Sequence, residues 1–336
     1  MDKIFGFAIL SFAITAILLV PFIDFLYKIK LQRKHVKSRD MFNKRTPIFD
    51  KYSQGKIGTP FGGGALIIIV VTMIALWTYG MFKVDVKFWE LFVLLFAFIG
   101  YGLLGFYDDL KKILNKGNDG FFGLTFRHKF VLQWVLAFII GAIFYYKLGY
   151  SFVYLHWLGQ LPLGFLFIPF AAFVIVSFVN AFNITDGLDG MASGVFMIAL
   201  IAFLTISHAL LDSFLALFIA ILLGSIVAFL YFNIFPARIW LGDVGSLSLG
   251  AVLAVIGLLT GKPAAIGVIG GVFVVEVGSS LLQILWKKFY GKKLFPVAPL
   301  HLYFLEKGWG EPKTVMRAWI FALIFAVIGL YVAFIG

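Results

Sequence analysis

The 336-residue chain is 62% hydrophobic and only 13% charged, and it carries a formal net charge of +12. A soluble domain of this size cannot bury so much apolar surface in one core, whereas a lipid bilayer can solvate it. The chain has no cysteine, which excludes disulfides, thiolate metal sites, iron–sulfur clusters and cysteine nucleophiles.

A transmembrane helix needs roughly 20 apolar residues to cross the hydrocarbon core, and ten segments of the chain qualify. In chain order they are Ile4–Leu26, Phe61–Thr78, Trp89–Phe106, Phe130–Tyr146, Leu161–Val179, Met191–Ile206, Phe214–Tyr231, Val244–Leu259, Ala265–Leu285 and Ala318–Ile335. The first segment lacks a small-residue cleavage site, so we expect a retained span and not a signal peptide. The sequence therefore predicts an all-α integral membrane protein with about ten transmembrane helices, forming a single polytopic domain over residues 1–336.

Lysine and arginine divide unevenly between the loops on the two sides of such a bundle. Loops 28–56, 107–129, 233–243 and 286–317 hold 23 of the 28, and the opposite side holds 5. Because basic loops stay in the cytoplasm, we expect these loops there and both termini outside. The positive net charge also points to anionic partners, either lipid headgroups or phosphorylated substrates. Nucleic acid is not expected, since the chain offers no soluble basic domain.

Several carboxylates lie at the predicted cytoplasmic helix ends, in apolar surroundings: Asp108, Asp109, Asp186, Asp189 and Asp243. A single loop carboxylate often only caps a helix. Adjacent acids repel each other unless a cation lies between them, and oxygen-rich clusters of this kind suit Mg²⁺ together with substrate phosphates. Nearby lysines can bind phosphate as point charges, although some serve as positive-inside anchors; these are Lys111, Lys112, Lys116 and Lys129.

Glycine-rich turns flank the acids at 183–190 and 240–246, and a further one at 58–64 opens the second predicted span. Such turns at helix N-termini bind anions, because the free N–H groups point outward. No Walker-type motif is present, and no G-x-G-x-x-G follows a predicted strand. The sequence therefore excludes P-loop nucleotide hydrolases and Rossmann enzymes.

Several motifs resemble those of the polyprenyl-phosphate N-acetylhexosamine-1-phosphate transferases. They are Asp-Asp-x-x-Lys at 108–112, Asn-Ala-Phe-Asn-Ile-Thr-Asp-Gly-Leu-Asp-Gly at 180–190 and Leu-Gly-Asp-Val-Gly-Ser at 241–246. Further motifs are similar to those of the phospho-N-acetylmuramoyl-pentapeptide transferase branch. These are Lys-x-Gly-Thr-Pro at 56–60, Val-Val-Glu at 274–276, Ala-Pro-Leu-His at 298–301 and Gly-Trp-x-Glu-Pro-Lys at 308–313.

The resemblance implies a reaction and its participants. Such enzymes move phospho-MurNAc-pentapeptide from UDP-MurNAc-pentapeptide to undecaprenyl phosphate, giving lipid I and UMP with Mg²⁺ as cofactor. By resemblance, Asp243 binds the metal, and Asp108 and Asp109 form the acidic catalytic pair, with Asp108 deprotonating the lipid phosphate. The resemblance also places the protein in the cell inner (cytoplasmic) membrane with its active site at the cytoplasmic face, and a homodimer is common in the family.

His301 matches the first residue of a triple-histidine motif that here reads His-Leu-Tyr. Trp240 takes the place of an aromatic residue that stacks on uracil. Nucleotide- and phosphate-site roles are implied for Lys56, Asn183, Asp186, Asp189 and Asn233. Direct attack by the lipid phosphate and a covalent aspartyl-phosphate route both use these residues, and we favour direct attack.

Other functions compete with this interpretation. A related transferase that uses UDP-GlcNAc keeps the acids but usually carries a different histidine-containing loop. A transporter is the alternative from another class, and it would place ionisable groups near the bilayer midplane. Here only Glu276 sits well inside a predicted span. An inactive scaffold homologue is a third alternative, because two histidines of the motif are missing.

Overall fold

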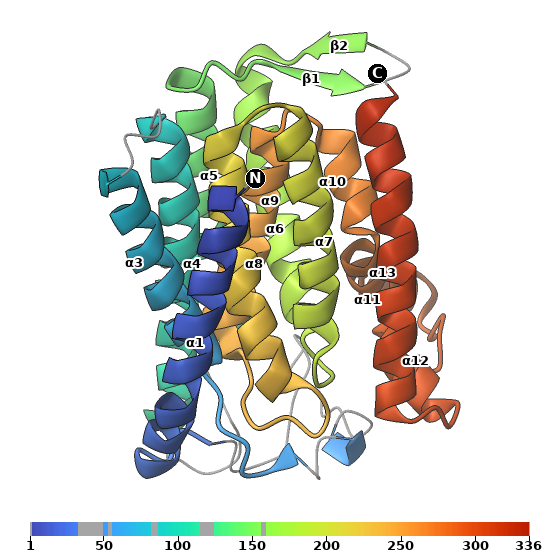
Figure 1. Cartoon of the computed structure of the whole chain (residues 1–336). Helices are drawn as coiled ribbons and strands as arrows, with labels where there is room; N and C mark the ends of the chain where they lie inside the picture. Colours follow the sequence, from blue (N-terminus) through green and yellow to red (C-terminus); the bar gives the residue numbers. More distant parts are fainter. Residues whose placement is uncertain are drawn as a thin grey trace.

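The computed structural model describes residues 2–32, 50–52, 56–81, 87–114, 124–155 and 159–335. Within these ranges the chain is a bundle of helices with one short hairpin (Figure 1). The elements are α1 (Asp2–Lys28), α3 (Gly63–Met81), α4 (Phe88–Leu114), α5 (Phe126–Tyr146), β1 (Phe152–Leu155), β2 (Gly159–Pro162), η2 (Gly164–Leu166), α6 (Phe167–Thr185), α7 (Met191–Ala209), α8 (Ser213–Asn233), α9 (Gly242–Leu259), α10 (Pro263–Ile269), α11 (Gly271–Tyr290), α12 (Leu300–Glu306) and α13 (Glu311–Phe334).

The helices confirm the predicted class of a multi-span membrane protein. In the described part of the chain, nine helices are long and apolar enough to cross a bilayer, or ten when α10 and α11 count as one span. This agrees with about ten predicted spans. An α-helix suits hydrocarbon because it satisfies its backbone hydrogen bonds within its own segment.

Two predicted spans differ from the structure. The segment Ala265–Leu285 is not one straight helix, because α10 and α11 meet at a bend of 77°. The break falls at Gly270 and Gly271, where an added Cβ would lie 2.4 Å from the Phe178 ring and 2.6 Å from the Phe325 ring. Glycines let neighbouring helices press closely against this joint, and a glycine pair is a common place for a helix to kink.

The predicted span Leu161–Val179 begins too early. Residues 159–162 form β2, which pairs antiparallel with β1, and α6 starts only at Phe167. Pro162 interrupts the apolar run, and so does Gly164, which has a φ of +54°. The segment is hydrophobic, but its first residues end β2 at Pro162 and form η2 from Gly164, so the helix starts later.

Helix α9 lies at the centre of the bundle, where it packs against α3, α4 and α6. Nearly all of its side chains from Val244 to Leu259 are buried. Helix α8 is also largely buried and packs against α1. A helix that is apolar on every side belongs in the interior of a membrane domain, whereas α1 and α13 expose most of their apolar surface at the rim.

Alternating helix directions gather one set of loops at one end, drawn at the bottom of Figure 1. We call this the basic end: α1, α4, α6, α8 and α11 finish there, and α3, α5, α7, α9 and α13 begin there. The hairpin lies at the opposite end, toward which both termini point (Figure 1). The described loops are therefore grouped as the charge pattern predicts; the side of the membrane that each end faces stays a prediction.

Candidate active site

Three carboxylates meet at the basic end, where the last turns of α4 approach the first turn of α9. Asp108 and Asp109 lie on α4, and Asp243 is the second residue of α9. The first two are 3% and 5% exposed. Acids that are about 130 residues apart in the chain thus form one buried cluster, as the sequence predicted.

Glycine allows the two helices to come this close. Gly242 has φ +73°, a conformation that favours glycine, and a Cβ there would lie 2.8 Å from Asp109 Oδ2. A Cβ on Gly105 would lie 2.1 Å from the backbone oxygen of Asp243. Asp109 Oδ2 also accepts a hydrogen bond of 3.1 Å from the backbone N–H of Val244. Its negative charge therefore caps the positive N-terminus of α9.

Two lysine ammonium groups lie between the carboxylates. Lys112 Nζ is 2.7 Å from Asp243 Oδ2, 3.2 Å from Asp109 Oδ1 and 3.3 Å from Asp108 Oδ2. Lys129 Nζ, on α5, is 2.5 Å from Asp243 Oδ2 and 3.1 Å from Asp108 Oδ2. Lys112 follows Asp108 by one helical turn, so both project from the same face of α4. Three carboxylates around two ammonium groups leave one formal negative charge.

The oxygen atoms of this cluster suit a hard cation. Mg²⁺ takes carboxylate oxygens at about 2.0–2.1 Å and keeps other positions for water and substrate phosphates. Three carboxylates already lie within 3.3 Å of one positive nitrogen, Lys112 Nζ. Among the described residues no three His, Cys, Asp or Glu side chains form a ready-made metal site. A metal ion would therefore have to replace an ammonium group beside Asp243.

Asn183 fixes the orientation of Asp243 from a third helix, α6. Its amide nitrogen donates to Asp243 Oδ1 at 3.1 Å and to Ser246 Oγ at 2.7 Å. Each oxygen of the Asp243 carboxylate thus has its own donor, because the lysines bind Oδ2. Ser246 was not predicted as a site residue; its only sequence signal is its place in the Leu-Gly-Asp-Val-Gly-Ser motif.

A second polar group surrounds the turn between α6 and α7. Lys56 Nζ donates to Asp189 Oδ1 at 2.7 Å and also to Glu311 Oε1. The same Glu311 oxygen accepts the backbone N–H of Asp189 at 2.7 Å. Trp240 Nε1 donates to Asp189 Oδ1 at 3.1 Å. The structure therefore brings three predicted residues together and adds Glu311, which the sequence had marked only as part of a motif.

Asn233 holds the far side of this turn. Its Oδ1 accepts the Ser193 hydroxyl at 2.6 Å and the Gly190 N–H at 3.2 Å, while its Nδ2 donates to the Ile239 carbonyl at 3.0 Å. Because all these contacts are internal and Asn233 is only 2% exposed, the residue shapes the turn from within. The sequence had predicted substrate contact at this position.

Asp186 directly follows the last residue of α6, and its charge interacts with Asp243 of the first group and with Asp189 and Lys56 of the second. The structure shows no hydrogen bond from its carboxylate to any described residue. Burial, together with the negative charges of Asp243 and Asp189, raises the pKa of Asp186 to about 7 against the lowering effect of Lys56. A carboxylate with this pKa changes charge readily when a cation or a phosphate arrives nearby.

His301, in the first turn of α12, contacts the same turn from the side of α11. Its ring Nδ1 lies 3.0 Å from Glu276 Oε2. Of the ring atoms, Nε2 lies nearest Gly187: a Cβ added to Gly187 would lie 2.6 Å from it. The histidine ring thus packs against Gly187 in the α6–α7 turn, and among the described residues no hydrogen bond joins it to the three-carboxylate cluster. Glu276 is explained by this contact, so it no longer favours a transporter.

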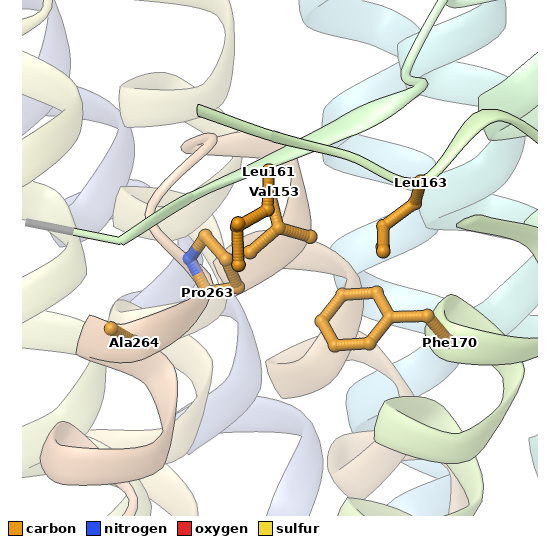
Figure 2. Close-up of a pocket in the computed structure, with 6 residues that line it drawn as sticks. All are labelled: Val153, Leu161, Leu163, Phe170, Pro263 and Ala264. Carbon is orange, nitrogen blue, oxygen red and sulfur yellow. The ribbon is translucent and has the colours of Figure 1, made fainter. Parts of the chain in front are cut away.

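Lys116, another predicted phosphate-binding residue, lies outside the described residues. The apolar pocket in Figure 2 also lies away from the site. It has a volume of about 270 Å³ and is lined at the hairpin end by Val153, Leu161, Leu163, Phe170, Pro263 and Ala264. None of these side chains carries a polar group, so the pocket offers no chemistry.

Comparison with known proteins places the chain among transferases. Residues 91–261 match the family Glycosyl transferase family 4. The chain is 37% identical over 330 residues to the phospho-N-acetylmuramoyl-pentapeptide-transferase of Geobacillus sp. (strain WCH70), covering 96% of each protein. It is 35% identical over 331 residues to that of Caldanaerobacter subterraneus subsp. tengcongensis, covering 98% of this chain and 99% of the relative.

A third relative, from Citrifermentans bemidjiense, carries the same name and is 38% identical over 294 residues, covering 82% of this chain and 80% of the relative. The first two relatives cover 96% and 98% of this chain, so their likeness extends through the carboxylate cluster, the α6–α7 turn and the α12 region. The chain therefore belongs to the phospho-N-acetylmuramoyl-pentapeptide-transferase family.

Proposed function

We propose that this protein transfers phospho-MurNAc-pentapeptide from UDP-MurNAc-pentapeptide to undecaprenyl phosphate, forming lipid I and UMP in peptidoglycan synthesis. The observation that carries the proposal is the buried cluster of three carboxylates and two lysines at one end of a membrane bundle, in a chain with full-length relatives of that name. A soluble donor and a lipid acceptor can meet only at such an interface.

The chemistry needs positive charge more than covalent participation. Phosphoryl transfer depends mainly on positioning and on neutralising the phosphate oxygens. Lys112 and Lys129 are already desolvated and converge on one point, so the pyrophosphate of the donor can replace the carboxylates as their partner. When bound, Mg²⁺ would supply further charge neutralisation at the phosphates, with Asp243 as its ligand and Asn183 holding that carboxylate in place.

The acidic pair divides into two roles. Asp109 is committed to the N-terminus of α9 through Val244, so its function is to hold the cluster. Asp108 interacts with both lysines and with the backbone N–H of Leu124. We assign Asp108 as the base that takes the proton from the lipid phosphate, after which the phosphate oxygen attacks the donor directly.

The α6–α7 turn is the proposed nucleotide site. Trp240 supplies an aromatic face for uracil, and Lys56, Asp186 and Asp189 surround the space beside it. His301 provides a ring nitrogen toward the same turn. We place the protein in the cytoplasmic membrane with the basic end in the cytoplasm; a homodimer stays a prediction from the family resemblance.

The test uses purified protein in detergent with polyprenyl phosphate and Mg²⁺. Lipid product is extracted and identified by mass after incubation with UDP-MurNAc-pentapeptide or, separately, with UDP-GlcNAc. The proposal predicts a lipid-linked product from the first donor only. Product from UDP-GlcNAc alone would assign the chain to the other donor class, and no product from either would leave it as a scaffold.

A further inference from the structure

One face of α11 carries polar side chains in a helix that is otherwise largely apolar. Glu276, Ser279 and Gln283 are spaced three and four residues apart, so they project from the same side of the helix. Of these positions, only Glu276 belongs to a motif that the sequence singled out, and the proposed reaction uses none of them. Polar groups in a membrane helix are costly unless they have partners, so their partners indicate their purpose.

All three side chains bind the segment that leads into α12. Gln283 Oε1 accepts the backbone N–H groups of Leu294 and Phe295 at 3.0 and 2.8 Å, and its Nε2 donates to the Phe295 carbonyl at 2.9 Å. Ser279 Oγ accepts the Leu300 N–H at 3.2 Å. This face of α11 therefore fixes residues 294–300 from one end to the other.

Glu276 ends this row with two contacts to one residue. Its Oε2 lies 3.0 Å from His301 Nδ1 and accepts the His301 backbone N–H at 3.4 Å. Glu276 and His301 are only 4% and 2% exposed. A buried carboxylate without a partner is strongly unfavourable, so the pair holds the imidazole in a single position.

The contact also determines which ring nitrogen carries the proton. A carboxylate accepts hydrogen bonds, so Nδ1 must be the N–H donor toward Glu276. The other nitrogen, Nε2, is then directed at Gly187, between Asp186 and Asp189. Fixing one nitrogen of a histidine sets the chemistry that the other presents.

We propose that Glu276 is a positioning residue, which holds the His301 proton on Nδ1 and directs Nε2, as an acceptor, into the α6–α7 turn of the proposed nucleotide site. The inference rests on the proposed transferase function for its kinetic consequence, but the orientation of the ring does not depend on that function. Glu276 itself touches no reacting atom in this arrangement.

Three substitutions separate the reach of Glu276 from its charge. Glu276→Gln keeps an acceptor at the same reach, and the His301 backbone N–H keeps the amide oxygen turned toward the ring. Glu276→Asp keeps the charge but is one methylene too short, and Glu276→Leu removes both. We expect Glu276→Gln to retain kcat within about three-fold of the wild type. Glu276→Asp and Glu276→Leu should lose roughly 10- to 100-fold in kcat, the range typical when a histidine loses the partner that orients it.

The donor KM should change less than kcat in all three variants, because the binding turn stays assembled by Lys56, Glu311 and Asn233. Thr15→Val is the matched control: it removes a buried hydrogen bond of 3.0 Å between α1 and α8, remote from the site. The kcat of Thr15→Val should equal that of the wild type, even when its melting temperature is similar to those of the Glu276 variants. A wild-type kcat in Glu276→Asp would contradict the proposal.

Selective ¹⁵N labelling of the histidines gives a readout that needs no turnover. The chain has 5 histidines, and His301→Gln identifies the signal of interest. The wild type and Glu276→Gln should show the ring proton on Nδ1, whereas Glu276→Asp and Glu276→Leu should shift it toward Nε2. Unchanged His301 signals in Glu276→Asp would overturn the proposal whatever happens to kcat. If the wild type releases no UMP, the proposed function fails, but this spectroscopic result still decides the role of Glu276.

Discussion

Lys112 Nζ lies 2.7 Å from Asp243 Oδ2, across 131 residues of sequence. The sequence led us to expect a cation between the acids, and in the structure the protein supplies that charge with its own lysines. An internal ammonium group stabilises the carboxylates in the absence of substrate, and it makes the positive charge available when phosphates arrive. The site is therefore arranged for phosphate before either substrate binds.

Replacing this lysine should expose the repulsion that it relieves. In Lys112→Met the ammonium group of Lys129 still contacts Asp108 and Asp243, but Asp109 loses its ion pair. Breaking a buried ion pair from one side typically costs about 3–5 kcal/mol. We expect a clearly lower melting temperature in EDTA and a larger recovery on adding Mg²⁺ than the wild type shows. Differential scanning fluorimetry in detergent measures both values.

The matched control is Lys111→Met, on the same helix turn. Lys111 lies over the Tyr107 ring at 5.0 Å instead of facing the carboxylates, so its loss should leave the Mg²⁺ response unchanged. An equal response in the two variants would mean that the lysine charge does not compensate the cluster.

Trp240 should act on donor binding through its ring and on the turn through its N–H. Base stacking on an aromatic side chain is worth about 1–3 kcal/mol, so Trp240→Ala should raise the donor KM with little change in kcat. Trp240→Phe keeps a stacking face but loses the hydrogen bond to Asp189. Its donor KM should therefore lie between those of the wild type and Trp240→Ala. A lower melting temperature with an unchanged KM in both variants would make Trp240 an interfacial anchor instead.

The raised pKa of Asp186, about 7, predicts a pH-dependent stability. An aspartate in an unfolded chain has a pKa of about 3.9, so between these values the folded protein holds a proton that the unfolded chain has lost. Stability then falls as the pH rises from about 4 to 7. Asp186→Asn removes this effect, so its melting temperature should exceed that of the wild type by more at pH 8 than at pH 5, without substrate or Mg²⁺. The same difference at both pH values would refute the assignment.

The missing histidines of the triple motif are not equivalent in the structure. Leu302 is 5% exposed and belongs to the hydrophobic core, whereas Tyr303 is half-buried with Lys307 over its ring. Leu302→His should therefore lower the melting temperature, because it buries a polar ring among apolar neighbours. Tyr303→His should be tolerated. Neither should raise kcat/KM if His301 alone serves this site, and a large gain in the paired variant would show that the departure limits activity.

For His301 itself, the prediction concerns turnover. His301→Ala should lose at least about ten-fold in kcat/KM, because it removes the ring nitrogen Nε2 that Glu276 directs into the turn. A loss of only two- or three-fold, with a lower melting temperature, would mean that the ring only orders the loop through Glu276.

Apolar length alone predicted the helices, since hydrocarbon leaves few other solutions for the backbone. It did not reveal the bend at Gly270 or the hairpin around Gly159, because hydropathy measures solvation and not chain direction. The cluster of Asp108, Asp109 and Asp243 was predicted because acids at two helix ends on one side of a bundle have few other places to lie.

Two carboxylates with essential contacts were not predicted. Glu311 binds Asp189 across 122 residues, and Glu276 binds His301 across 25. Neither pair follows a helical or strand spacing, so no local pattern identifies the partners. Glu276 carried a signal, a charge inside an apolar span, but only the structure reveals its contacts with His301.

The most direct test of the account is UMP release from UDP-MurNAc-pentapeptide with polyprenyl phosphate in detergent, with and without Mg²⁺, for the wild type, Asp243→Asn and Asp108→Asn. An amide is nearly isosteric with a carboxylate, so both variants should remain folded and extractable while the charge is lost. We predict Mg²⁺-dependent release by the wild type and less than about a tenth of that rate in each variant, consistent with a lost charged group at a catalytic site. Retention of more than that by either variant at saturating Mg²⁺, or release by the wild type without any divalent cation, would contradict the assigned roles.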